Sequence, residues 1–388
     1  MNFSVATLGE LSLGDGKYGI AASAVDYDAE LPAYLRITDI NDDGTLNWND
    51  RKSVDDPAAR KYMLSEGDIV FARTGNSTGR NYYYDPRDGT FAFAGFLIRF
   101  SLDDRKVNPR YIKYYAQSKA YWSWVASFNT GSTRGNINAK TYAQMPIPLP
   151  DRPTQDSIVT LCDSISNKIR LNTKLNGYLA EIADALFTDA FGNLEDNAVL
   201  SDIAKITMGQ SPAGTSYNEE GVGTVFYQGR GEFGWRYPAQ RLFTTEPKRM
   251  AKSGDVLMSV RAPVGDLNLA YEDCCIGRGL AAISCDYPSY CLYLMRSLGK
   301  KLDAYNGEGT VFGSISGKAL KGIGIGLPGN DDIAAFEAMV APIDAQIRCN
   351  ETESRILSQL RDALLPKLMS GEIGASKVHL TRPNSHLA

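Results

Sequence analysis

One phrase occurs twice in this chain, and the repetition constrains the fold more than any other feature of the sequence. Residues 66–80 read EGDIVFARTGNSTGR, and residues 253–266 read SGDVLMSVRAPVGD. Each copy begins near Gly-Asp, continues through apolar residues and reaches an arginine in a loop of small residues. Apolar runs that end in glycine-rich turns predict a strand followed by a loop in both places. We therefore expect two copies of one structural unit.

The repetition continues into the segments that follow. Residues 132–150 read STRGNINAKTYAQMPIPLP, and residues 311–328 read VFGSISGKALKGIGIGLP. An offset of 178 residues relates Gly135 to Gly313, Ile137 to Ile315, Lys140 to Lys318 and Pro150 to Pro328. Both regions mix Tyr, Val and Ile with turn residues and contain a short basic, aromatic segment that is typical of a surface helix. The predicted class is α+β, with two α/β domains in tandem.

A long helical pattern follows each copy, with apolar residues at spacings of three and four, as in a coiled-coil seam. The expected seam residues are Ile158, Leu161, Ile165, Leu175, Leu179, Ile182 and Leu186 in the first helix, and Phe336, Met339, Ile343, Leu357, Leu360 and Leu364 in the second. Asn172 and Asn350 lie mid-seam, again 178 residues apart, and a buried asparagine fixes register when it finds a partner. We expect an antiparallel coiled coil; the alternative is that each helix packs on its own domain.

The predicted domain order follows from the repeat. The ranges are 1–151 and 191–330 for the two α/β domains, 152–190 and 331–370 for the two helices, and 371–388 for a flexible C-terminal tail. About 35 helical residues form a rod about 50 Å long. Paired rods of that length would hold two domain surfaces at a fixed separation, as a molecular ruler does.

Charge is distributed unevenly along the chain. The net charge is −4, yet residues 71–140 hold eleven Lys and Arg against four Asp and Glu, and residues 226–321 hold thirteen against nine. Two basic segments in an acidic chain can form the local positive surfaces that contact with phosphate requires. No apolar run is long enough for a membrane span, and residues 1–11 lack a basic, apolar leader. A cytoplasmic protein with reduced cysteines is therefore expected.

Catalytic chemistry is hard to place in this sequence. The only two histidines are His379 and His386, in the polar tail, so no folded part offers a histidine for a catalytic triad or a common zinc site. The stretch GSISGKA (313–319) has three residues between its glycines where a phosphate loop has four, and Ala319 where magnesium binding needs Ser or Thr. We expect no enzymatic activity, no metal site and no cofactor bound by this chain.

The repeated phrase, the long helices and the absence of catalytic motifs resemble those of the specificity subunits of type I restriction–modification systems. GDVLMSVRAPVGDLNLA followed by CCIGRGLAAI is similar to their target recognition domains, and GDIVFARTGNSTGR is similar to a variant of the same element. The long helix opening at PTQDSIV and the ending LLPKLMSGEI also match the family, so the resemblance covers residues 1–373.

The resemblance implies a non-catalytic role in DNA recognition. In that family each recognition domain reads one half of a bipartite, asymmetric target in double-stranded DNA, while the paired helices set the spacer. Two methyltransferase subunits with S-adenosylmethionine, and through them restriction/translocase subunits with ATP and Mg²⁺, would be the partners. A specificity subunit of a type IIB-like system is a close alternative. A nuclease or methyltransferase acting alone and a purely structural coiled-coil scaffold are the other classes left open.

Candidate DNA contacts come from residue chemistry, because Arg and Lys suit guanine, and Asn and Gln suit adenine. In the first domain they are Arg73, Thr74, Asn76, Ser77, Thr78, Arg80, Arg134 and Asn136. In the second they are Gln210, Gln228, Arg230, Arg236, Arg261 and Arg278. Arg73 and Arg261 are taken as equivalents in the repeat. Since a shared residue cannot easily distinguish two half-sites, both are expected to contact phosphate or brace the fold.

Overall fold

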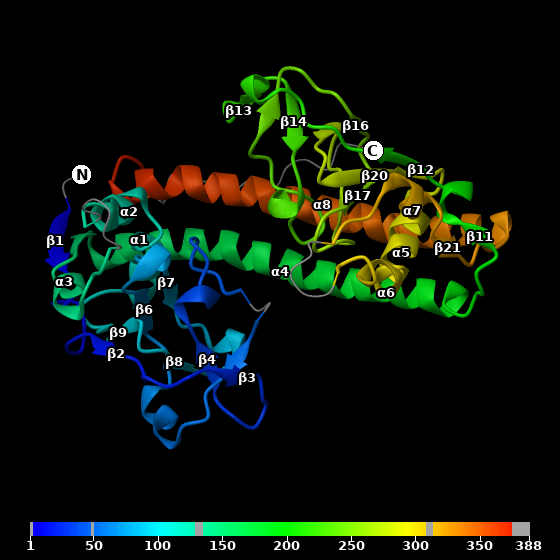
Figure 1. Cartoon of the computed structure of the whole chain (residues 1–388). Helices are drawn as coiled ribbons and strands as arrows, with labels where there is room; N and C mark the ends of the chain where they lie inside the picture. Colours follow the sequence, from blue (N-terminus) through cyan, green and yellow to red (C-terminus); the bar gives the residue numbers. More distant parts are fainter. Residues whose placement is uncertain (1–2, 48–49, 129–134, 308–312, 375–388) are drawn as a thin grey trace. The chain divides into compact units, whose positions relative to one another are not determined.

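Two compact units make up the chain, each including part of both long helices (Figure 1). The structure, a computed structural model, describes residues 3–47, 50–128, 135–307 and 313–374. Unit 1 comprises Met1–Arg170 and Glu353–Ala388, and unit 2 comprises Leu171–Thr352. The boundaries pass through helices α4 (Arg152–Phe191) and α8 (Asn330–Met369). The boundaries between the units therefore lie inside the two long helices and not at the predicted domain boundaries. The predicted domain ranges remain a prediction.

Unit 1 contains two four-stranded sheets. The first has the order β2-β9-β6-β7 and consists of β2 (Lys17–Tyr18), β6 (Asp68–Ala72), β7 (Asn81–Tyr83) and β9 (Leu97–Ser101). The second has the order β3-β5-β4-β8 and consists of β3 (Val25–Asp26), β4 (Ala33–Leu35), β5 (Lys52–Ser53) and β8 (Phe91–Phe93). Strand β1 (Ser4–Thr7) pairs separately with β10 (Pro146–Leu149). The α-helices are α1 (Pro109–Tyr115), α2 (Lys119–Ala126) and α3 (Ala139–Ala143).

Strand β6 is buried on both faces, which explains its unbroken apolar run. Ile69 and Phe71 pack into the core formed with α1, α2 and the α4 and α8 segments of unit 1. Val70 and Ala72 point to the opposite face, into the core shared with the second sheet. Because successive side chains of a strand alternate between faces, each of the four apolar residues of β6 finds apolar neighbours.

Unit 2 repeats this arrangement. Its first sheet has the order β12-β20-β17-β18 and consists of β12 (Lys205–Met208), β17 (Val256–Ser259), β18 (Leu267–Leu269) and β20 (Leu280–Ser284). Its second has the order β13-β15-β14-β19-β16 and consists of β13 (Tyr217–Asn218), β14 (Thr224–Tyr227), β15 (Phe243–Thr244), β16 (Met250–Ala251) and β19 (Cys274–Ile276). Strand β11 (Ala198–Val199) pairs with β21 (Gly324–Ile325). The α-helices are α5 (Pro288–Ser297), α6 (Gly299–Asp303) and α7 (Gly317–Lys321).

The two units share one strand topology. In each, the strand that carries the Gly-Asp phrase (β6 or β17) lies between two antiparallel neighbours of its first sheet. The second sheet of each unit joins two strands in parallel, β4 with β8 and β14 with β19. Short 3-10 helices connect the strands at Ile37–Asp39, Pro57–Tyr62, Gly75–Ser77, Pro86–Asp88, Leu200–Asp202, Gly214–Ser216 and Arg230–Glu232. The repeat seen in the sequence is therefore also a repeat of architecture.

Within each unit the α4 and α8 segments run antiparallel. In unit 1, Ile158 and Cys162 share a core with Leu365 and Leu368. In unit 2, the Asn172 side-chain amide donates to the Asn350 carbonyl at 3.2 Å, and farther along α4 the rings of Phe187 and Phe336 lie 5.6 Å apart. As the residue number rises along α4, the number of the contacting residue in α8 falls, as antiparallel helices require.

The predicted seam is wrong at Leu175 and Ile182 of α4, whereas Leu186 packs against the core of unit 2. Leu175 and Ile182 are 40% and 50% exposed, and Met339 of α8 is 56% exposed. The buried residues of this part of α4 are instead Asn176, Ala180, Ala183 and Phe187, each one position later than the expected set. A straight α-helix has 3.6 residues per turn, so it drifts away from a 3.5-residue pattern. Moreover, alanine can line the contact although it stands out weakly in an apolar pattern.

All six cysteines are free thiols, and Cys349 is exposed. No helix among the described residues is long and apolar enough to cross a membrane.

Candidate nucleic-acid interface

A pocket in unit 2 gathers four of the six residues predicted for the second domain. It has a volume of about 290 Å³. The lining residues are Gln228, Gly229, Arg230, Ser259, Arg261, Ala262, Arg278 and Gly279. We call it the arginine pocket. The C-terminal ends of β14 and β17 and the turn between β19 and β20 supply these residues. Positions up to 51 residues apart in the sequence thus meet at one site.

Close backbone packing holds together the three segments that line the arginine pocket. The Gly277 N–H donates to the Tyr227 carbonyl at 2.8 Å, and the Val260 N–H donates to the Gly279 carbonyl at 2.9 Å. A Cβ at Gly277 would lie 2.8 Å from the Gln228 carbonyl oxygen, closer than real Cβ contacts. The glycines of the CIGRG sequence therefore permit the close approach of three segments, which leaves Arg278 exposed at the edge.

Two arginines of the pocket have uncommitted side chains. Arg261 and Arg278 are exposed, and within the described part of the chain neither guanidinium has a hydrogen-bond or ion-pair partner. Arg230 differs, because it forms an ion pair with Asp266. The pocket thus presents the free guanidinium groups of Arg261 and Arg278 and the side-chain amide of Gln228. The guanidinium group of Arg230 is also there, but Asp266 neutralises its charge.

Gln210 lies next to this site without lining it. Its N–H donates to the Ile276 carbonyl at 2.9 Å, and the neighbouring Ser211 hydroxyl accepts from the Arg278 N–H at 3.4 Å. The Gln210 side chain is exposed. It can therefore extend the polar surface beside Arg278.

Arg236 does not belong to the interface, so its assignment as a DNA contact is wrong. Its side chain is 3% exposed, forms an ion pair with Asp344 of α8 and donates to the Tyr293 hydroxyl at 2.9 Å. Burial disfavours the charged form, yet the negative Asp344 and the Tyr293 hydroxyl raise the pKa of Arg236 above its usual value. This arginine joins the sheet region to α8 inside unit 2.

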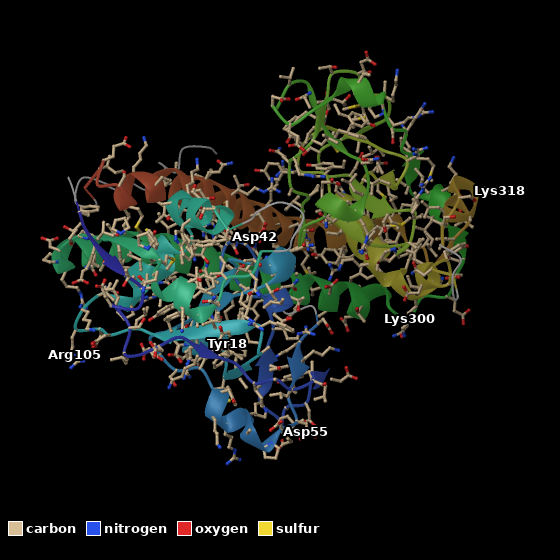
Figure 2. All side chains as sticks on the ribbon, turned by 60° about the vertical axis from the view of Figure 1, so that its left-hand side comes forward. Tyr18, Asp42, Asp55, Arg105, Lys300 and Lys318 are labelled. Atoms are coloured by element: carbon tan, nitrogen blue, oxygen red, sulfur yellow. The ribbon has the colours of Figure 1, made fainter. Side chains whose placement is uncertain are left out.

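In unit 1, Arg73 lies against aromatic rings. Its guanidinium carbon is 5.1 Å from the ring centre of Tyr18, labelled in Figure 2, and 5.8 Å from that of Phe96. The Ala139 N–H donates to the Tyr18 hydroxyl at 3.2 Å, which fixes the Tyr18 ring beside α3. Stacking on aromatic faces suits arginine, so Arg73 is held in place, half-buried.

The rest of the predicted loop in unit 1 is mostly uncharged. Thr74 forms a bridge with Asn136, and the Thr78 hydroxyl lies 2.9 Å from the Gly135 carbonyl. Asn76 and Asn136 are exposed, whereas Ser77 is buried. The structure thus brings this loop to the Gly135–Asn136 segment.

Arg80 carries an ion pair at the end of the same loop. Its Nε donates to Asp42, labelled in Figure 2, at 2.7 Å, and its Nη1 donates to the Ile40 carbonyl at 3.2 Å. Its charge is therefore largely neutralised inside unit 1. Arg134 lies outside the described residues.

The backbone hydrogen bonds show that the two motif arginines are not equivalent. The Ile137 N–H donates to the Arg73 carbonyl at 2.9 Å, and the Ile315 N–H donates to the Val260 carbonyl at 3.1 Å. Since Ile137 and Ile315 correspond in the repeat, Val260 occupies the place of Arg73, and Arg261 lies one residue later. The equivalence expected from the sequence is wrong.

The one-residue difference has a large structural effect. Thr74 bridges Asn136, and Arg261 bridges Ser314, so Arg261 occupies the place of Thr74. Because side chains alternate between the faces of a strand, Arg261 points to the face opposite to that of Arg73. Arg261 lines the pocket beside Gln228, whereas Arg73 contacts Tyr18 and Phe96.

Sequence reasoning missed Tyr18, Phe96 and Ser259. Tyr18 lies in a two-residue strand, within a segment whose sequence showed no motif. Ser259 ends β17 and lines the arginine pocket, and its hydroxyl accepts from the Asp266 N–H at 3.0 Å. No spacing in the sequence pointed to these residues, because their neighbours come from other strands.

Within the described residues, no group of three or more His, Cys, Asp or Glu side chains could hold a metal ion. The arrangement offers guanidinium, amide and hydroxyl groups. These are the side chains that recognise phosphates and base edges.

Known proteins are similar to this chain in sequence and in fold. Residues 34–180 match the family model described as the type I restriction modification DNA specificity domain. The type I restriction enzyme MjaX specificity subunit of Methanocaldococcus jannaschii is 29% identical over 81% of this chain and 80% of its own. The MjaIX specificity subunit of the same organism is 23% identical over 69% of each chain.

A solved structure agrees in fold. The S subunit of a type I restriction–modification system from M. genitalium superimposes with a TM-score of 0.58 and 16% identity, over 95% of this chain and 96% of its own. The chain is thus similar to type I restriction enzyme specificity subunits, and its residues 34–180 match the DNA specificity domain of that family.

Proposed function

We propose that this chain is the non-catalytic DNA-specificity subunit of a restriction–modification complex. The repeated sheet module of each unit reads one half of a bipartite, asymmetric target in double-stranded DNA. The antiparallel α4 and α8 segments set the spacer and dock two methyltransferase subunits, which in turn hold the restriction/translocase subunits. S-adenosylmethionine, ATP and Mg²⁺ belong to those partners.

One observation carries this proposal. Two modules whose first sheets have the same strand order present different polar side chains at equivalent places, the end of β6 and the end of β17. Arg261 and Arg278 are exposed there in unit 2, whereas unit 1 has the exposed Asn76 and Asn136 and the half-buried Thr74. A shared scaffold with unlike contact residues is what reading of two unlike half-sites requires.

The test is methylation mapping of DNA from cells that express the full chain with its cognate methyltransferase subunits. Residues 1–151 are then exchanged for the matching segment of another specificity subunit. We expect a two-part motif of which one half changes and the other persists. A continuous motif, or a motif that does not depend on this chain, would contradict the proposal.

A specificity subunit of a type IIB-like system would behave in the same way in this assay. The two are distinguished by purifying the complex, because a type IIB-like partner cuts and methylates in one polypeptide. The stand-alone enzyme alternative predicts that the purified chain modifies DNA when given Mg²⁺ or S-adenosylmethionine.

A further inference from the structure

The arginine pocket contains a set of groups that unit 1 does not have at the equivalent positions. Matching backbone hydrogen bonds establish the equivalence. Ala94 donates to the Leu35 carbonyl at 2.9 Å, as Gly277 donates to that of Tyr227 at 2.8 Å. The next residue in each place therefore corresponds as well. Gly95 of unit 1 is therefore at the position equivalent to Arg278 of unit 2, and Arg36 is at the position equivalent to Gln228.

Unit 1 has no free cation at these places. Thr74 stands for Arg261, and Gly95 stands for Arg278. Arg36 is committed, because its guanidinium pairs with Asp39 at 2.7 Å and with Asp50 at 3.3 Å. The two exposed guanidinium groups are therefore a property of unit 2 rather than of the shared scaffold.

This difference bears on what Arg261 and Arg278 contact. Phosphate groups are the same in every half-site, so residues that only bind phosphate are expected at the same positions in both modules. Base edges differ between half-sites, so the residues that read them should differ between modules. Arg261 was expected to contact phosphate because Arg73 was taken as its equivalent in the repeat. The strand register shows that the two residues are not equivalent, so this reason no longer applies.

The side chains of the pocket indicate which DNA base it recognises. A free guanidinium presents two parallel N–H donors, which match the O6 and N7 acceptors of guanine in the major groove. Lysine lacks this fork. Arg230 cannot offer its charge as freely, since Asp266 pairs with it.

We infer that Arg261 and Arg278 read guanine in the half-site of unit 2, and that the unit 1 half-site is read without arginine at these positions. This inference rests on the proposed function and assigns a base to one of its two halves. Gln228 lies beside the guanidinium groups and can orient them or contact the neighbouring base.

The test compares Arg261→Lys, Arg261→Gln and Arg278→Lys with the unchanged chain by methylation mapping in the full complex. The half-site that persists after exchange of residues 1–151 belongs to unit 2. We expect each variant to relax one guanine position of that half, with a loss of discrimination of roughly 5- to 150-fold. The other half should stay the same.

The lysine variants separate base reading from phosphate contact, because lysine keeps the charge and loses the fork. If Arg261→Lys and Arg278→Lys preserve the motif while the Arg261→Gln variant lowers methylation equally at all sites, these arginines bind phosphate and the inference is wrong. A unit 2 half-site without guanine would overturn it as well. Either result leaves the two-part motif, and therefore the proposed function, intact.

Arg241→Gln is the matched control. Arg241 is an exposed arginine of unit 2 that pairs with Glu232 at 3.1 Å and does not line the pocket. The motif should be unchanged in this variant. Arg261, Arg278 and Arg241 are all exposed, so each substitution changes a side chain at the surface.

Discussion

Asn350 donates a hydrogen bond from its side-chain Nδ2 to the Oδ1 of Asn176 over 2.8 Å, and both side chains are buried in unit 2. Further bonds surround this pair. Gln346 donates to the Asn350 Oδ1 at 2.8 Å, and Asn176 donates to Glu351 at 2.9 Å. A buried polar group is costly unless it is satisfied, so this network favours one alignment of α4 against α8.

Replacing Asn350 by leucine should destabilise the protein by about 1–3 kcal/mol, because Asn176 then loses its buried donor. Thermal and urea unfolding of the purified chain measure this loss. Leucine at the exposed Gln359 of the same helix is the control and should have little effect. The double variant Asn176→Leu, Asn350→Leu should be more stable than Asn350→Leu alone, since both partners are removed together; a larger loss in the double variant would contradict the role of this pair.

Arg236→Gln should lower stability by about 3–5 kcal/mol, since Asp344 would keep a largely buried charge without its partner. The DNA motif should nevertheless stay the same, because Arg236 is buried away from the arginine pocket. Unfolding and methylation mapping test the two statements separately. A changed motif in a stable, folded variant would return Arg236 to the group of DNA contacts.

Two buried thiols predict a loss of stability at alkaline pH. Burial raises the pKa of Cys162 to about 12 and that of Cys274 to about 12, from an ordinary value of 9.0. The unfolded chain releases these protons at lower pH than the folded chain does. The contribution of the buried thiols to folding stability is therefore complete below pH 9 and is lost as the pH rises toward 12. Urea unfolding between pH 8 and 10.5 should show a decline on the order of 1–2 kcal/mol per thiol.

The variant Cys162→Ala, Cys274→Ala should show a shallower alkaline decline. Cys349→Ala is the control, because this thiol is exposed. Equal slopes in both variants would assign the decline to other groups.

Gly277→Ala should destabilise unit 2 by about 1–3 kcal/mol. The added Cβ would lie 2.8 Å from the Gln228 carbonyl oxygen and 2.9 Å from the Gln228 Cα, and backbone atoms cannot move aside cheaply. Gly214→Ala is the control, since a Cβ there meets nothing within 4 Å. Thermal unfolding compares the two, and equal melting temperatures would show that this contact is not tight in solution.

A paired insertion tests the spacer role. Seven residues of heptad sequence, added after Arg170 in α4 and after Thr352 in α8, lengthen each helix by about 10 Å. The methylated motif should keep both halves and gain about three unread base pairs between them, at 3.4 Å per base pair. Seven flexible Gly-Ser residues at the same places are the control and should not give a single new spacer length. An unchanged spacer after the helical insertion would show that the helices do not set it.

The sequence by itself determined the duplicated α+β organisation, the two long helices and the similarity to type I specificity subunits. These depend on local patterns: glycine and aspartate at strand starts, strand-forming runs, and apolar spacing in helices. The Asn172 and Asn350 pair was visible too, because an asparagine within an apolar seam stands out in the sequence.

Only the tertiary structure decided which side chains meet. Arg73 and Arg261 look alike in the sequence, yet a shift of one residue relative to the neighbouring strand sends them to opposite faces. Arg236 resembles its neighbours in charge, but Asp344, 108 residues away, holds it in the interior. Local pattern cannot show either outcome, because strand register and burial depend on contacts between segments that are far apart in the chain.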